Sequence, residues 1–278
     1  MFPPLPLISR AARACSNAVI VLVVMVAAPA AAQSNSIQLE DLTWPELQQR
    51  VAGGATTVIV PTGGTEQNGP HMPLGKHNLV VAEVAERIAR ALGKTLVAPV
   101  LKIVPEGPMD TPTGNAKFPG TLGLSVDTFQ RVLRDTAASL ARAGFTTICF
   151  IGDHGESQAP QEHVAQQLTQ ALQSFGIKVI NVSAYYAPDL EERQLIRSGL
   201  PAASLGEHGG VADTAQLMAV SPKSVRADLL DLNKWKGEAP SGATGKPQLA
   251  TAELGESLLR LRVENAVGQI RAAVGAKR

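Results

Sequence analysis

The chain has 278 residues, of which 45% are hydrophobic and 18% are charged. Lysine plus arginine number 25 and aspartate plus glutamate 24, and this near-balance argues against a nucleic-acid-binding protein and against an acidic disordered chain. The two cysteines exclude a disulfide framework and a cysteine-rich zinc module. What remains is a globular domain with a sizeable core, in which the 5 histidines are the residues to follow.

The amino-terminal segment has the pattern of a secretory signal peptide. Two arginines precede an uncharged apolar run at residues 18–28, which is shorter than the roughly 20 residues that a membrane-spanning helix needs. Small residues then offer a cleavage site after Ala32. The sequence predicts a signal peptide at residues 1–32 and a single mature domain at residues 33–278 with a formal charge of −1, located in the periplasm or secreted. An uncleaved membrane anchor is the alternative.

Along the mature chain, short apolar runs alternate with amphipathic stretches, a pattern typical of βα units and a mostly parallel sheet. Strands are predicted at residues 57–61, 145–151 and 177–182. Helices are predicted at residues 79–92, 126–143, 160–175, 211–220 and 250–274, from the spacing of their apolar residues. Asn78 and Ser125 are expected to cap the first two helices, and Cys149 is expected to be a buried, inert thiol.

Two stretches, residues 104–123 and 227–248, are long, irregular and rich in glycine and proline, which indicates functional or mobile loops. Ligands of parallel sheets bind beyond the carboxyl ends of the strands. The loops after the first and second predicted strands follow such ends. They place residues 66–77 and 154–156 on the same rim.

Histidines and carboxylates gather in these loops. Four of the five histidines have a carboxylate close by in a polar, glycine-rich loop, and they are His71, His77, His154 and His208. His163 alone lies within a predicted helix, where a surface position is expected. Imidazole and carboxylate together suit zinc, manganese and iron, and an open site of this kind activates water for hydrolysis. Capping and turn residues that happen to include histidine are the structural alternative.

Other catalytic motifs are missing. Residues 69–76 lack the spacing of a phosphate-binding loop, and no G-x-S-x-G elbow is present. Ser157 follows Glu156 in the second loop, so a serine nucleophile stays open as a third interpretation.

The chain resembles the creatininase family (creatinine amidohydrolase-like proteins) over residues 40 to 270. The family's first signature, P-x-G-x-x-E-x-H-G-x-H-x-P-x-x-x-D, is similar to residues 61–77. The N-G-H loop resembles residues 152–157, and the segment with histidine followed by E-T resembles residues 208–214. Residues 118–121 and 242–255 also look like family segments.

This resemblance implies an α/β fold, a three-layer α/β/α sandwich with a mostly parallel central sheet, and an oligomer, often a hexamer. It also implies a hydrolase that cleaves C–N bonds of cyclic or linear amides with one or two divalent metals. By position, Glu66 and His154 match metal ligands, Glu156 matches a second-metal carboxylate, and His208 matches an acid/base histidine. Glu156 is the other candidate for proton transfer, and His71 and Trp235 are expected to contact substrate.

Three positions depart from the family pattern. Asn68 replaces a ligand histidine, His77 replaces a bridging aspartate, and Asp213 shortens a glutamate. A neutral imidazole offers one lone pair, where a carboxylate can bridge two ions. We therefore expect one ion on Glu66, His77 and His154, zinc first with manganese or iron as alternatives. A second, weaker ion would depend on Asn68, Glu156 or Asp213.

The leading hypothesis is therefore an exported, metal-dependent amidohydrolase with a small-molecule amide as substrate. It needs no nucleic acid, and no membrane once the signal is cleaved. The main alternative is a non-catalytic metal- or ligand-binding protein on the same fold, suggested by Asn68 and His77.

Overall fold

A four-stranded parallel sheet forms the centre of the computed structural model, which describes residues 34–108, 110–237 and 239–275. The strands are β1 (Thr57–Thr62), β2 (Thr95–Val97), β3 (Thr147–Gly152) and β4 (Lys178–Asn181). Their order is β2-β1-β3-β4, and every neighbouring pair is parallel. The predicted signal peptide lies outside the described residues, so its cleavage stays a prediction.

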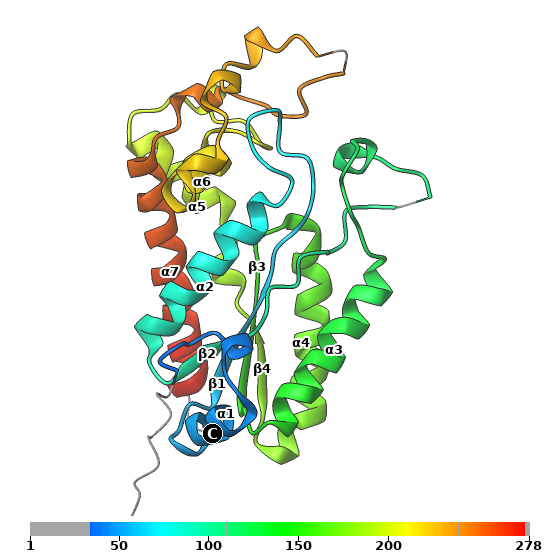
Figure 1. The fold of residues 1–278 in the computed structure, drawn as a ribbon, viewed down its shortest axis with the longest axis vertical. Helices are drawn as coiled ribbons and strands as arrows, with labels where there is room; N and C mark the ends of the chain where they lie inside the picture. Colours follow the sequence, from blue (N-terminus) through cyan, green and yellow to red (C-terminus); the bar gives the residue numbers. More distant parts are fainter. Residues whose placement is uncertain (1–33, 109, 238, 276–278) are drawn as a thin grey trace, which may run out of the picture. The chain divides into compact units, whose positions relative to one another are not determined.

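Helices cover both faces of this sheet, which confirms the predicted α/β/α layers (Figure 1). They are α1 (Trp44–Ala52), α2 (Lys76–Leu92), α3 (Val126–Arg142), α4 (Gln158–Leu172), α5 (Pro188–Arg197), α6 (Val211–Val220) and α7 (Ala252–Gly275). One core lies between the sheet and α2 with α7, and the other between the sheet and α3 with α4. None of the helices in the described part combines the length and apolar character that a membrane span needs.

Strand β1 shows why the sheet has two cores. Val58 and Val60 point into the core with α3 and α4, whereas Ile59 points into the core with α2 and α7. Side chains on a strand alternate between faces, so a strand buried on both sides is a continuous apolar run. The same alternation places Cys149 of β3 on the α2 side. Burial raises the pKa of its thiol to about 12, which confirms the expected inert cysteine.

A third apolar cluster joins α5, α6 and α7 beyond the sheet (Figure 1). Its buried members include Leu195, Leu205, Val211 and Leu258. It supports the loop that carries His208, just before α6. Together with the loops that follow β1 and β3, this loop surrounds one cavity.

The periodic segments match their predicted elements closely, with boundaries shifted by a few residues. Ser125 caps α3 as expected, since its Oγ accepts a hydrogen bond from Thr128 N at 3.2 Å. Asn78 does not cap α2, which begins two residues earlier, after Gly75. Instead, Asn78 Oδ1 accepts a hydrogen bond from Gly64 N at 3.1 Å and ties the loop after β1 to the helix. Three elements, β2, α1 and α5, were not predicted from the sequence, and β2 has only three residues.

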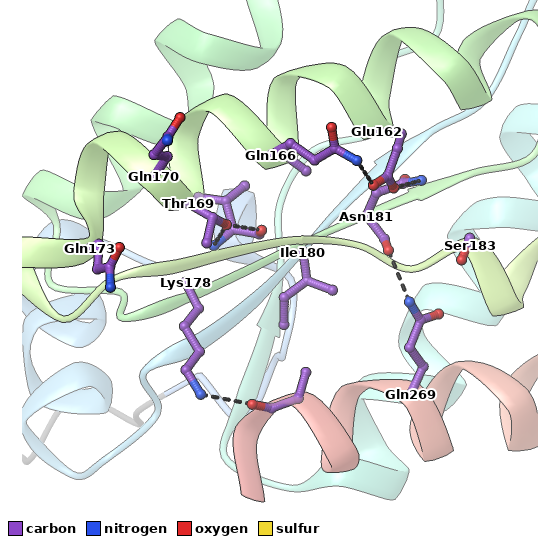
Figure 2. Close-up of a pocket in the computed structure, with 13 residues that line it drawn as sticks. Glu162, Gln166, Thr169, Gln170, Gln173, Lys178, Ile180, Asn181, Ser183 and Gln269 are labelled. Atoms are coloured by element: carbon purple, nitrogen blue, oxygen red, sulfur yellow. Dashed lines mark hydrogen bonds between the residues drawn. The ribbon is translucent and has the colours of Figure 1, made fainter. Parts of the chain in front are cut away.

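Side chains from two helices protect the exposed edge of β4. Thr169 of α4 donates to Val179 O and accepts from Val179 N, and Gln269 of α7 donates to Asn181 O at 3.1 Å (Figure 2). An unpaired edge would otherwise offer backbone groups to another chain. The groove of about 670 Å³ along this edge is lined by side chains of α4, β4 and α7, including Gln166 and Lys178.

The close packing of α6 on α7 depends on Gly255. A Cβ at this position would lie 1.9 Å from the Ala215 carbonyl oxygen, which is backbone and cannot turn away. Gly268, on the same helix, has nothing within 4 Å of its Cβ position. We expect Gly255→Ala to lower the free energy of unfolding by more than about 2 kcal/mol. Gly268→Ala should change it by less than about 1 kcal/mol, towards stabilisation. Urea unfolding of both variants tests this, and equal midpoints would contradict the packing argument.

Candidate metal centre

The loop after β1 folds back over the start of α2 and directs its side chains towards the end of β3. Glu66 N donates to Leu74 O at 3.0 Å, which closes the loop. Gly63 is needed at its beginning, because a Cβ there would lie 2.0 Å from Asn78 Oδ1. The turn that follows ends at Lys76, so His77 lies in the first turn of α2.

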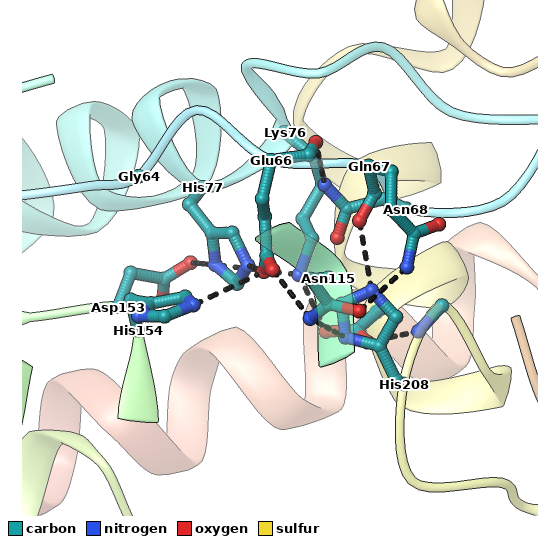
Figure 3. A network of polar contacts seen from close by, with 12 residues as sticks. Gly64, Glu66, Gln67, Asn68, Lys76, His77, Asn115, Asp153, His154 and His208 are labelled. Atoms are coloured by element: carbon teal, nitrogen blue, oxygen red, sulfur yellow. Dashed lines mark hydrogen bonds and ion pairs between the residues drawn. The ribbon is translucent and has the colours of Figure 1, made fainter. Parts of the chain in front are cut away.

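Three side chains converge at this point, one from the loop after β1, one from α2 and one from the loop after β3. The ligand atoms of Glu66, His77 and His154 all lie within 4.8 Å of one another, and all three residues are buried. Glu66 Oε1 is 2.7 Å from His77 Nε2 and 3.3 Å from His154 Nε2 (Figure 3). The two imidazole rings meet edge to face, with centroids 5.3 Å apart. Two imidazole nitrogens and one carboxylate are a donor set that binds catalytic zinc.

The far side of the His77 ring defines which nitrogen can bind a metal. Nδ1 lies 2.9 Å from Asp153 Oδ2, and an ionised carboxylate can only accept. Lys76 Nζ, which can only donate, lies farther from Nδ1, at 3.3 Å, so the shorter contact with Asp153 assigns the proton to Nδ1. The lone pair of Nε2 then points at Glu66 Oε1. Two acceptors 2.7 Å apart require a cation, either a proton or a metal ion, to satisfy both.

Asp153 is in turn held by buried partners. Tyr185 OH donates to Asp153 Oδ1 at 2.7 Å, and the Arg262 guanidinium pairs with the same oxygen. Burial alone would favour the protonated acid, but the charge of Arg262 and the hydrogen bond from His77 keep the pKa of Asp153 well below its usual value. Arg262 also pairs with Glu191, so it neutralises two buried carboxylates.

Asn115, from the irregular segment at residues 104–123, orients Glu66. Its Nδ2 donates to Glu66 Oε2 at 2.6 Å, which leaves Oε1 directed at the two histidines. Although burial opposes ionisation, hydrogen bonds with His154 and His77 hold the pKa of Glu66 well below its usual value. Burial also opposes protonation of His154, yet its hydrogen bonds with Glu106 and Glu66 raise its pKa to about 10.

The other carboxylates predicted for this centre lie apart from the three converging side chains. Glu156 and Asp213 line the same cavity but do not join the cluster. Glu156 is exposed, and Asp213 is held by Lys76 Nζ at 2.6 Å and by Gly209 N at 2.9 Å. Asn68 is fully buried, and its amide nitrogen donates to the Glu66 carbonyl at 2.9 Å.

His208 lines the cavity with one defined tautomer. Its Nε2 is 2.8 Å from the Gln67 carbonyl oxygen, which can only accept, so Nε2 carries the proton. Nδ1 then carries the lone pair and accepts a long hydrogen bond from Asn115 Nδ2 at 3.4 Å (Figure 3). The nitrogen of His208 that could exchange a proton with a ligand is therefore Nδ1.

The structure does not place the two expected substrate contacts at the cavity. His71 is fully buried, and its Nε2 is 2.9 Å from Thr214 Oγ1 on α6. Burial lowers the pKa of His71 to about 4, so the ring is neutral and serves as packing. Trp235 is 36% exposed and donates its indole N–H to Ala239 O within its own loop. Proximity in sequence to polar loops suggested both assignments, and the folded loops direct both side chains elsewhere.

Several contributors to the centre were not predicted from the sequence, namely Lys76, Glu106, Asn115, Asp153 and Arg262. Asp153 could have been identified, because it precedes His154 at a strand end. Glu106 and Asn115 lie in a stretch without periodicity, so only the path of the folded loop reveals their position.

The cavity over the centre has a volume of about 930 Å³ and a strongly acidic lining. Its exposed carboxylates are Glu156, Asp189, Glu192 and Glu207, and none of these is in an ion pair within the described residues. Arg262 is the one arginine or lysine of the lining, and it is already paired. The arrangement therefore combines a possible metal site with an opening that attracts cations.

Comparisons of the sequence and of the structure with known proteins agree on one family. The family model for creatininase, creatinine amidohydrolase, matches residues 40–270. A creatinine amidohydrolase of Pseudomonas putida is 28% identical over 262 residues, covering 86% of this chain and 97% of the relative. A mycofactocin precursor peptide peptidase of Mycobacterium ulcerans is 24% identical, covering 85% of this chain and 88% of the relative. The solved structure "Creatininase Mn" matches with a TM-score of 0.69 and 25% identity, covering 86% of this chain and 98% of that chain.

Metal binding at these residues should release protons. Because the pKa of His154 is about 10 without metal, a divalent ion must displace a proton from it at neutral pH. The apparent affinity should therefore strengthen as pH rises, by up to about tenfold per pH unit for one proton displaced. Calorimetry with Mn²⁺ in buffers of different ionisation enthalpy measures the number of protons released. Binding without proton release would contradict the assignment of His154.

Proposed function

The chain belongs to the creatininase family, and we propose that it is an exported, metal-dependent amidohydrolase acting on a small cyclic or linear amide. The observation that carries this proposal is the convergence of Glu66, His77 and His154 beneath a cavity large enough for a small substrate. The similarity to a creatinine amidohydrolase supports a cyclic amide, and that to a peptide peptidase supports a linear one.

The residues present fit a divalent ion. His77 and Glu66 direct two acceptor atoms at each other, and His154 completes a set of three donors. A divalent ion there supplies Lewis-acid activation of water and of the amide carbonyl. Asp153 holds the His77 ring in the tautomer that leaves Nε2 free, and Asn115 holds the Glu66 carboxylate.

We propose one resident ion, with zinc or manganese as the candidates. Lys76 argues against a tight second ion, because its ammonium is buried and lies 2.6 Å from Asp213 Oδ1. Asn68 Oδ1 is buried without a hydrogen-bond partner and is the remaining donor for a second ion, but a neutral amide oxygen brings no negative charge to balance that of the ion.

His208 and Glu156 are the candidates for proton transfer to the leaving nitrogen. His208 presents Nδ1, because its Nε2 proton is bonded to the Gln67 carbonyl. Glu156 is an exposed carboxylate of the same cavity and can exchange protons with solvent. General acid–base catalysis requires such a group within hydrogen-bond reach of the substrate.

The serine hydrolase interpretation has little support. Ser157 is fully buried, and its Oγ donates to the His154 carbonyl at 2.8 Å. A hydroxyl engaged in this way lacks the adjacent base that nucleophilic catalysis needs. Export, a periplasmic or secreted location and a homo-oligomer, such as a hexamer, complete the proposal on the evidence of the sequence.

Chelation and a matched pair of histidine variants test the activity. We expect a panel of lactams, ureido compounds and peptide amides to include a substrate whose hydrolysis stops with EDTA and returns with Mn²⁺ or Zn²⁺. His154→Ala should reduce the rate to below about 1% of wild type, because it removes a metal donor. His163→Ala, an exposed histidine on α4, should retain full activity. Metal binding without hydrolysis of any panel member would favour the non-catalytic binding protein instead.

The charge of the cavity predicts which amides react best. Exposed, unpaired carboxylates around the opening should favour cationic or neutral amides over anionic ones of equal size, by about tenfold or more in kcat/KM at low salt. Added salt should reduce this preference, since exposed charges are screened. Asp189→Asn combined with Glu192→Gln, both on α5, should reduce it as well. A preference for anionic amides that is independent of salt would contradict this electrostatic role.

A further inference from the structure

Glu106 reaches the metal centre from the irregular segment that follows β2. This segment runs beside the carboxyl end of β1, where Leu101 N donates to Pro61 O at 2.9 Å and Gly63 N donates to Leu101 O at 2.9 Å. Further along, Leu124 N donates to Val104 O at 3.0 Å and fixes the segment two residues before Glu106. Its backbone is therefore held next to the loop that carries Glu66.

The side chain of Glu106 points into the cavity and is only partly satisfied. It is 5% exposed and belongs to the cavity lining. Its Oε2 lies 3.0 Å from His154 Nε2, and its Oε1 has no hydrogen-bond partner. A Cβ on Gly64 would lie 3.3 Å from Oε1, so the glycine leaves room for this carboxylate. A buried carboxylate oxygen without a partner is costly, which points to a missing positive group.

The contacts of His154 point to the same missing group. Its Nε2 faces two carboxylate oxygens, Glu106 Oε2 at 3.0 Å and Glu66 Oε1 at 3.3 Å. One ring N–H can form a good hydrogen bond with only one of them, whereas a central cation attracts both. Ligand atoms bound at about 2.0–2.2 Å to one ion lie roughly 3 Å apart, which is the spacing of these two contacts with His154 Nε2. Glu106 lies outside the group of Glu66, His77 and His154, whose ligand atoms are all within 4.8 Å of one another, so its carboxylate has to move towards the other donors when an ion binds.

His77 and His154 differ in how their rings are held. His77 Nδ1 is fixed by Asp153 at 2.9 Å, but His154 Nδ1 is buried without a partner. Outer hydrogen bonds normally orient metal-binding imidazoles. In the absence of such a bond, the contacts on the Nε2 side, including Glu106, position the His154 ring.

We propose that Glu106 is a fourth protein ligand of the ion, so that two carboxylates and two imidazoles bind it. This inference rests on the metal site proposed above. Two ionised carboxylates balance the charge of a divalent ion in a buried site. The additional oxygen donor also makes the site harder, which shifts its preference towards Mn²⁺ and away from Zn²⁺.

Metal binding by Glu106→Gln tests this assignment without any need for a substrate. Glutamine keeps the size of the side chain and removes the anionic donor. We expect the variant to bind Mn²⁺ at least about tenfold more weakly than wild type, measured by competition with a chelator. We also expect the visible absorption of the Co²⁺-loaded protein to change, because this absorption reports coordination number and geometry. Glu264→Gln, an exposed carboxylate of α7 that does not line the cavity, is the matched control and should behave as wild type.

The possible results distinguish a failure of the Glu106 assignment from a failure of the metal site itself. Unchanged affinity and spectrum in Glu106→Gln would overturn the assignment. Weaker binding with an unchanged Co²⁺ spectrum would overturn it too, since a residue that acts only through His154 leaves the ligand set intact. If wild type and His154→Ala both fail to bind Co²⁺, the metal site itself is refuted. Circular dichroism and thermal melting of each variant exclude a folding defect as the cause.

Discussion

The buried carboxylate of Asp153 is the constraint on which the candidate centre depends, because it connects the metal-binding side chains to the helical layer. One of its oxygens lies 2.9 Å from His77 Nδ1, and the other accepts from Tyr185 and pairs with Arg262. Arg262, on α7, also pairs with Glu191 of α5. Buried charges are tolerated only in such chains of pairs, and the loss of one partner costs about 3–5 kcal/mol. The orientation of His77 therefore depends on contacts between two helices and the end of β3.

The departures from the family signature form a coherent set in this structure. The resemblance implies an aspartate where His77 stands, and a histidine where Asn68 stands. The amide nitrogen of Asn68 donates a hydrogen bond to the backbone of its own loop, and the Lys76 ammonium forms an ion pair with the carboxylate of Asp213. A second ion would therefore find a neutral amide oxygen at Asn68, which is buried without a hydrogen-bond partner, and a carboxylate already paired at Asp213. Glu106 places a further carboxylate next to His154, at 3.0 Å from its Nε2.

Much of the fold and part of the site could be predicted from the sequence, for identifiable physical reasons. The buried strands and long helices have strong periodicity, and parallel strands bring their following loops together, which is why Glu66 and His154 could be placed on one rim. Asn78 was expected to cap α2, but the helix already begins after Gly75. Asn78 Oδ1 instead accepts a hydrogen bond from Gly64 N. The positions of Glu106 and Asn115 depend on how a loop without periodicity folds back on the sheet. No local pattern encodes that path, and the same limitation led to the misplacement of Trp235 at the cavity.

The contribution of α7 makes metal binding depend on contacts between distant parts of the chain. Arg262 lies on the final described helix, whereas Glu66 and His77 belong to the first βα unit. The orientation of these early donors therefore requires that helix to be docked. An ion that binds tightly only to the finished centre is captured by the folded protein and not by the nascent chain. The compartment in which folding is completed, with its own supply of zinc and manganese, would then determine which metal the protein carries.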